Sequence, residues 1–273
     1  MSTPNDAANV ELVVLPLGVG DAFSQKYYST SFLVGERQLS DGRIRWVLVD
    51  CPHPIRKILH EASQKVGFDV DVGDIDAVVL THLHADHVSG LEDFAYFSLF
   101  ALQKKVTLAC HPVVQKRLWD GCLAAGMERL VGVGETQHKT LDDYFDVVDL
   151  DFDAAVDVGP FKVACRATQH HIPTTALTFA SPSTSTSLGY SADTAFDLKL
   201  IDWLSTCSAF LHETNYGTHT PLDALIELPD DVRHKMGLVH YPDTHDVDAG
   251  PVRCAREGQL WTVTAEGFAA PKT

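Results

Sequence analysis

Apolar runs bounded by glycine, proline and aspartate alternate along the chain with segments whose apolar residues are spaced three and four apart. The first pattern predicts β-strands and the second predicts helices. Strands are expected at 10–17, 31–36, 44–51, 74–82, 106–111, 161–170, 208–214 and 234–241, with a strand pair over 175–193. Helices are expected at 54–67, 91–105, 113–126, 198–207 and 221–229.

The order of these elements predicts an α/β (α+β) fold in which layered sheets are covered by helices, because strands and helices alternate with several hairpins among them. The chain of 273 residues shows no internal repeat, low-complexity linker or composition break. We therefore expect a single domain over 1–273, with its core at about 10–268.

Charge and cysteine usage narrow the class of protein. The net charge is −16 and no cluster of lysine and arginine is present, which argues against a long nucleic acid as partner. Aspartates concentrate at 142–157, where a solvated face or loop is expected. No apolar stretch approaches a membrane span, the start is polar and lacks the apolar region of a signal peptide, and the six cysteines are scattered. Reduced thiols and a cytoplasmic location are expected.

The segment THLHADH, directly after an apolar strand, carries His82, His84, Asp86 and His87. From the residue frequencies, chance would produce this spacing roughly four times in a thousand such chains. Exposed loop histidines are the alternative to a metal site. Imidazole and carboxylate are ligands for a borderline cation such as zinc, and the group lacks the cysteines of a structural zinc site.

Four ligands in one short loop suggest two ions with further ligands from elsewhere in the chain. Three later positions offer them at the ends of apolar strands: the pair His170–His171, then Asp193, then His240. Only one member of the histidine pair is expected to face inward, because successive strand residues point to opposite faces.

This order of motifs, from residue 12 to residue 241, resembles the metallo-β-lactamase superfamily. The resemblance implies a four-layer αββα sandwich of two mixed sheets flanked by helices. It implies a first metal bound by His82, His84 and His170, and a second bound by Asp86, His87 and His240. Asp193 would bridge both ions, and the ribonuclease Z-like members favour His170 over His171.

Three segments resemble the ribonuclease Z-like and cyclic-nucleotide phosphodiesterase branch of that superfamily. GVGDAF resembles its opening glycine turn, and VLVDCP its second strand, whose Asp50 would support the metal loop unless it is an ordinary strand-end aspartate. LHETNY resembles the HEAT-type segment, which implies that His212 shuttles a proton and Glu213 orients it. Asp86 is a second candidate for handling the proton, and a structural role for His212 is the alternative.

The predicted reaction is hydrolysis of a phosphodiester in a small cyclic nucleotide, with a water activated by two divalent ions. Zinc is the default metal, with manganese and iron as alternatives. The arm of ribonuclease Z is missing, since only residues 171–192 separate His170 from Asp193. Transfer RNA processing is therefore disfavoured, and the armless relatives include phosphodiesterases of small cyclic nucleotides, among them anti-Pycsar enzymes.

Several alternatives remain open from the sequence. A lactonase, thioesterase or other carboxyl-ester hydrolase would use the same water on a carbonyl, and a non-catalytic binding member of the fold is a further reading. Tyr27 and Tyr28 would stack on a base if their loop covers the site, or else lie on the surface. The aromatic helix at 91–105 belongs to the core or packs on a second subunit in a homodimer.

Overall fold

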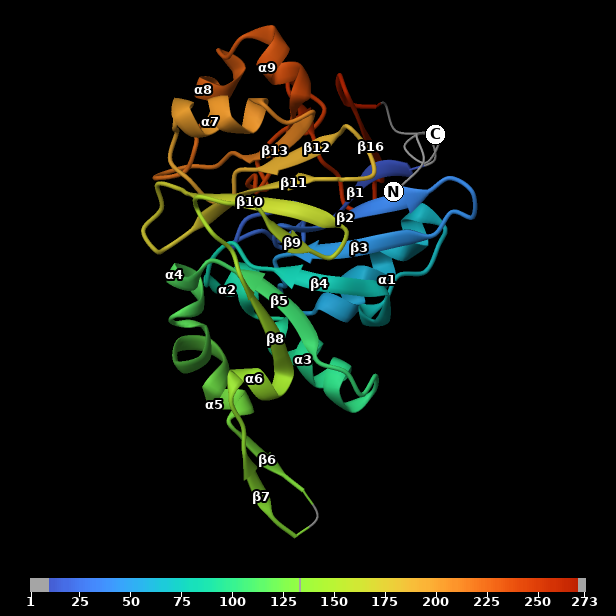
Figure 1. Ribbon diagram of the computed structural model, residues 1–273. Coiled ribbons are helices and arrows are strands. Elements are labelled where there is room, and N and C mark those ends of the chain that lie inside the picture. The colour runs from blue at the N-terminus through green and yellow to red at the C-terminus, as the bar shows by residue number, and fades with distance from the viewer. Residues whose placement is uncertain (1–9, 133, 270–273) are drawn as a thin grey trace.

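The computed structural model describes residues 10–132 and 134–269, so both ends of the predicted domain 1–273 lie outside the described residues. Its first large sheet has the strand order β17-β16-β1-β2-β3-β4-β5-β8 (Figure 1). The strands are β1 (Val10–Gly18), β2 (Ser31–Gln38), β3 (Ile44–Val49), β4 (Ile75–Val79), β5 (Val106–Cys110), β8 (Phe145–Asp149), β16 (Trp261–Thr264) and β17 (Gly267–Phe268). The sheet is mixed, because β1, β2 and β3 pair antiparallel whereas β3, β4, β5 and β8 run parallel.

The second large sheet has the order β15-β14-β13-β12-β11-β10-β9 and is also mixed. Its strands are β9 (Val156–Val158), β10 (Phe161–Ala167), β11 (Thr175–Ala180), β12 (Ser187–Tyr190), β13 (Ala209–Glu213), β14 (Met236–Val239) and β15 (Arg253–Cys254). From β12 to β15 the strands are parallel, so their carboxyl ends lie at one edge of the sheet.

Helices cover the outer faces of the two sheets (Figure 1). On the first sheet lie α1 (Ile55–Val66), η2 (Val72–Asp74), α2 (Ala85–Val88) and α3 (Leu91–Phe100), and on the second α7 (Leu198–Ser205), α8 (Leu222–Ile226) and α9 (Asp230–Lys235). The predicted layered sandwich of sheets and helices is confirmed. None of the helices in the described residues has the length and hydropathy of a membrane span.

The apolar sequence of strand β1 requires that both of its faces are buried. Leu12 and Val14 pack into the core between the sheets, whereas Val13 and Leu15 pack with α1 and α3. Successive side chains of a strand point to opposite faces, so an unbroken apolar run such as LVVL specifies an inner strand. All four side chains are fully buried.

Two segments differ from the expectation. The predicted helix at 113–126 is split into α4 (Pro112–Gln115), the π-helix η3 (Trp119–Leu123) and α5 (Ala124–Met127). The acidic stretch is more than a loop, because α6 (Leu141–Tyr144) and β8 precede β9 there, with Phe145 buried and Asp146 exposed. A small hairpin of β6 (Arg129–Val131) and β7 (Thr136–His138) projects from this region (Figure 1).

The aromatic helix α3 is partly a core element. Phe94 is buried, whereas Phe100 at its end is 61% exposed and stacks on Tyr96. The predicted homodimer therefore stays a prediction.

Candidate metal centre

The predicted ligands come together where several strands end. His82, His84, Asp86 and His87 follow β4 in the first sheet. In the second sheet, His170 follows β10, Asp193 follows β12 and His240 follows β14. Backbone hydrogen bonds hold the two edges together, since Thr175 donates its N–H to the carbonyl of Thr81 at 3.0 Å. The centre therefore lies between the two sheets at one end of the sandwich.

Asp50 supports the loop that carries the histidines through hydrogen bonds. This fully buried aspartate follows β3 and has a positive φ of 57°. One carboxylate oxygen accepts from the Thr81 N–H at 2.9 Å, and the other contacts Nδ1 of His87 at 2.8 Å. These contacts orient the His87 ring so that its Nε2 points toward the carboxylates of Asp86 and Asp193, at 3.4 and 3.5 Å. The geometry agrees with the supporting role predicted for Asp50.

The ligand atoms form two groups that meet at Asp193. The first consists of His82, His84, His170 and Asp193, and the second of Asp86, His87 and His240, with the atoms of each group within 4.8 Å of one another. One oxygen of Asp193 lies 3.7 Å from Nε2 of His82 and 3.5 Å from Nε2 of His240. Its other oxygen faces His87. Asp193 thus lies between the groups, as a bridging ligand would.

Several of these atoms are buried without a hydrogen-bond partner in the described chain, notably Nε2 of His87 and Oδ1 of Asp193. Buried polar atoms are nearly always paired, so unpaired ones that converge on one point fit a site that binds a cation. Burial lowers the pKa of His82 well below its usual range and that of His170 to about 4, so both rings are neutral, as metal ligands must be. The donor set, made of imidazole and carboxylate groups, fits divalent metal ions.

The structure gives the two adjacent histidines, His170 and His171, different surroundings. Nε2 of His170 lies 3.2 Å from Nδ1 of His84, inside the first group. His171 is exposed, and its ring lies beside that of His84 with 4.7 Å between centroids. His170 lies in the turn after β10 and not in the strand that was expected at 161–170, and His171 follows it in the same turn. The turn brings only His170 into the group.

His212 and Glu213 lie on opposite faces of β13. Glu213 is buried beside the centre, where its Oε1 accepts from the Thr194 N–H at 2.8 Å and contacts Nδ1 of His219 at 2.9 Å. His212 is fully buried, and its Nδ1 donates to the carbonyl of Glu213 at 2.7 Å. The structure does not bring His212 into the group of ligands, nor does His212 line the cavity above it.

His219 is a residue that the sequence analysis missed. Its ring stacks beside that of His240, and it forms a further group of donor atoms with Asp193 and His240. The hydrogen bond with Glu213 raises the pKa of His219, which favours the protonated ring. The signal was present in the sequence, because His219 follows Glu213 by six residues in HETNYGTH, but a loop conceals which side chains meet.

A cavity of 620 Å³ opens over the ligands and is lined by Phe23, Tyr216 and His219 among others. Phe23 belongs to the glycine turn GVGDAF and is 89% exposed, and its aromatic ring lines this cavity. Tyr27 and Tyr28 are elsewhere, since Tyr27 packs edge-on against Tyr241 and the Tyr28 hydroxyl donates to Glu61 at 2.9 Å. The structure therefore does not bring the two predicted tyrosines over the site.

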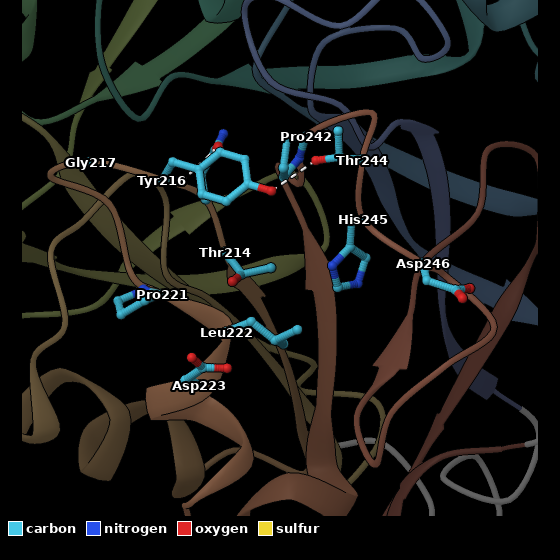
Figure 2. A pocket seen from close by; sticks show the side chains of 11 residues that line it. Thr214, Tyr216, Gly217, Pro221, Leu222, Asp223, Pro242, Thr244, His245 and Asp246 are labelled. Carbon is cyan, nitrogen blue, oxygen red and sulfur yellow. Dashed lines mark hydrogen bonds between the residues drawn. The ribbon is translucent and has the colours of Figure 1, made fainter.

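A neighbouring cavity of 460 Å³ shares Asn215, Tyr216 and Gly217 with the first. Figure 2 shows its walls, in which the Tyr216 hydroxyl and the Thr244 hydroxyl are hydrogen-bonded at 2.8 Å. Asp223 and Asp246 also line this cavity, and no lysine or arginine does.

Comparison with known proteins agrees with this architecture. Residues 12–261 match the family model described as Anti-Pycsar protein Apyc1. The Anti-Pycsar protein Apyc1 of Bacillus phage 010DV004 is 31% identical over 263 residues, which cover 90% of this chain and 96% of that protein. The corresponding protein of Bacillus phage BSP38 is 30% identical over 267 residues, with the same coverage.

Among solved structures, the metallo-β-lactamase fold protein YhfI from Bacillus subtilis superposes with a TM-score of 0.69 at 17% identity. The superposition covers 92% of this chain and 99% of YhfI, which confirms the predicted fold. Since the family model spans most of the residues that build both sheets, this chain, with its metallo-β-lactamase fold, belongs to the Anti-Pycsar protein Apyc1 family.

Proposed function

We propose that this protein is a binuclear metallo-phosphodiesterase that hydrolyses a small cyclic nucleotide. The observation that carries the proposal is the meeting of two groups of metal-ligand atoms at Asp193, beside the hydrogen-bonded pair His219–Glu213. A centre for two cations with a positioned acid next to it suits hydrolysis of an anionic ester. The membership in the Anti-Pycsar protein Apyc1 family supports this choice over a lactone or thioester.

In this proposal His82, His84 and His170 would hold the first ion, Asp86, His87 and His240 would hold the second, and Asp193 would contribute to both. Two divalent ions bound there would lower the pKa of a water molecule and neutralise the negative charge of the phosphodiester. Asp50 holds the His87 ring in orientation through Nδ1, as outer partners of metal ligands do. Zinc remains the default metal, with manganese and iron as alternatives, because the ligands are nitrogen and oxygen atoms.

The proton for the leaving oxygen is assigned to His219. Glu213 raises the pKa of this ring and fixes it through Nδ1, which leaves Nε2 to donate into the cavity. As the P–O bond breaks, the proton moves from Nε2 to the departing ribose oxygen. His212, which was expected to do this, has no access to the cavity, so His219 takes its place in the proposal.

Asp86 is a poor proton donor for the same step. Burial alone would raise its pKa, but contacts with His87 and His240 hold the pKa of the carboxyl below its usual range. An ionised carboxylate suits a metal ligand and has no proton to deliver.

The substrate class follows from size and charge. A cavity of 620 Å³ lies in the usual range for small-molecule sites and holds a mononucleotide rather than a folded nucleic acid. With a net charge of −16, the protein repels a long polyanion, whereas a single phosphodiester is offset by two bound cations.

The test is a parallel substrate screen. Protein loaded with zinc or manganese, its metal content measured, is incubated with 3′,5′-cyclic nucleotides, a lactone and a thioester. Cyclic nucleotides are expected to turn over, and Asp193→Ala is expected to abolish the activity because both ions lose a ligand. His212→Asn, which changes a residue outside the cavity, is the matched control and should keep activity. Turnover of the lactone or thioester alone would contradict the proposal.

A further inference from the structure

A second cavity adjoins the metal centre on the side of His84. It has a volume of 290 Å³ and shares His84 with the cavity over the ligands. Its apolar wall comes from three segments, namely the metal loop, helix α4 and the turn before β11, and consists of Leu83, Val113, Val114, Ile172 and Pro173. The volume is at the low end of ligand sites, so it fits one part of a ligand that continues into the larger cavity.

The polar side of this small cavity is formed by Arg117 and the π-helix η3. A Cβ built on Gly121 would lie 3.6 Å from both Cβ and Nε of Arg117, so this glycine lies against the Arg117 side chain. Arg117 makes no ion pair within residues 10–132 and 134–269, although aspartates abound on this protein. π-Helical turns occur often at functional sites, and a free guanidinium can stack on an aromatic ring.

The other cavity that adjoins the one over the ligands, next to Asn215 and Tyr216, has the wrong charge for a nucleotide. Asp223 and Asp246 line it, together with Tyr216 and His245 (Figure 2). An anionic ligand that is anchored at the metal centre would be repelled there, whereas Arg117 attracts it on the side of His84. Apolar walls with one planar cation suit a flat, uncharged aromatic ring.

From this we infer that the cavity between Val113, Pro173 and Arg117 binds the nucleobase of the substrate whose phosphodiester lies at the metal centre. The inference rests on the proposed function and adds where the base binds. Because the apolar walls contact the faces of the base and offer few hydrogen-bond partners to its edge, purines and pyrimidines bind alike. KM values are therefore expected to differ little between bases.

Paired aspartate substitutions test the inference by kinetics. Val113 is 41% exposed at the start of α4, where an aspartate is favourable for the helix, so Val113→Asp folds. Thr244→Asp places the same side chain at an exposed position of the acidic cavity next to Tyr216. Val113→Asp is expected to raise KM for 3′,5′-cyclic AMP about tenfold at nearly unchanged kcat, which corresponds to a partial loss of binding. Thr244→Asp is expected to leave KM nearly unchanged.

Cys122 provides a second readout, because it lines the small cavity and is exposed, whereas the other five cysteines are buried. Alkylation of wild-type protein by N-ethylmaleimide is followed by mass spectrometry. A saturating phosphorothioate analogue of cyclic AMP is expected to slow alkylation of Cys122 several-fold. Inorganic phosphate, which occupies the centre without a base, is expected to leave the rate unchanged.

The outcomes separate this inference from the function on which it rests. If the metal-loaded wild type hydrolyses no cyclic nucleotide, the proposed function fails and the inference fails with it. If the wild type is active but KM of Val113→Asp is unchanged, or raised no more than that of Thr244→Asp, only the assignment of the cavity is overturned. Equal alkylation of Cys122 with and without the analogue, or equal slowing by phosphate, overturns it too.

Discussion

Acidification is expected to destabilise the fold through His212, a histidine outside the metal centre. The ring is fully buried, its Nδ1 donates to the carbonyl of Glu213 at 2.7 Å, and its Nε2 has no partner in the described chain. Burial outweighs the hydrogen bond and lowers the pKa of His212 from 6.5 to about 4. The folded protein therefore keeps a neutral ring at a pH where the unfolded chain binds a proton.

This difference sets the direction and size of the effect. Above pH 6.5 the His212 ring is neutral in both the folded and the unfolded chain, so it does not change the free energy of unfolding. As the pH falls from 6.5 toward 4, only the unfolded chain binds the proton, and the free energy of unfolding decreases. Between pH 6.5 and pH 5, a span of roughly 1.5 pH units, the ring is protonated in the unfolded chain and neutral in the folded protein. At ~1.4 kcal/mol per unit, the free energy of unfolding falls by about 2 kcal/mol between pH 7.5 and pH 5.

The assay compares urea unfolding of the wild type and His212→Asn at both pH values. The amide of asparagine can donate to the same carbonyl and does not titrate. Protonation of the metal ligands destabilises both proteins alike and cancels in the comparison. The wild type should lose about 2 kcal/mol more than the variant on going to pH 5. Equal losses in both proteins would show that His212 is not held neutral by burial, and would refute the reasoning.

Three further outcomes are expected. Asp50→Asn removes the negative partner of His87 and should weaken metal binding about 10- to 100-fold in a competition titration with a chelator, whereas Asp146→Asn on the exposed edge should not. Glu213→Gln should lower kcat and move the basic limb of its pH profile to lower pH, because His219 loses the carboxylate that raises its pKa; an unmoved limb would contradict the role of His219. Removal of metal with a chelator should lower the melting temperature by an amount that grows with the metal concentration of the reference sample; an unchanged melting temperature would argue against bound metal.

The sequence alone predicted most of the buried strands and most of the candidate metal ligands, because both leave local patterns, whereas it did not predict β8 in the acidic stretch. An apolar run such as LVVL in β1 demands burial on both faces wherever it is placed. The HxHxDH loop carries four candidate ligands, three histidines and one aspartate, at a spacing that chance seldom produces, and the resemblance it supports placed Asp193 and His240 in order. The atoms of these residues lie within a few ångströms of one another in the structure.

Only the tertiary structure decided which residues of the turns and loops face the site. No sequence periodicity predicts the directions of their side chains. The turn after β10 selects His170 over His171, and the loop after β13 folds His219 back onto Glu213 while His212 points away. The glycine turn presents Phe23 at the cavity instead of Tyr27 or Tyr28. The physical reason is the same in each case: a strand has a fixed alternation of side chains, whereas the path of a loop depends on what it packs against.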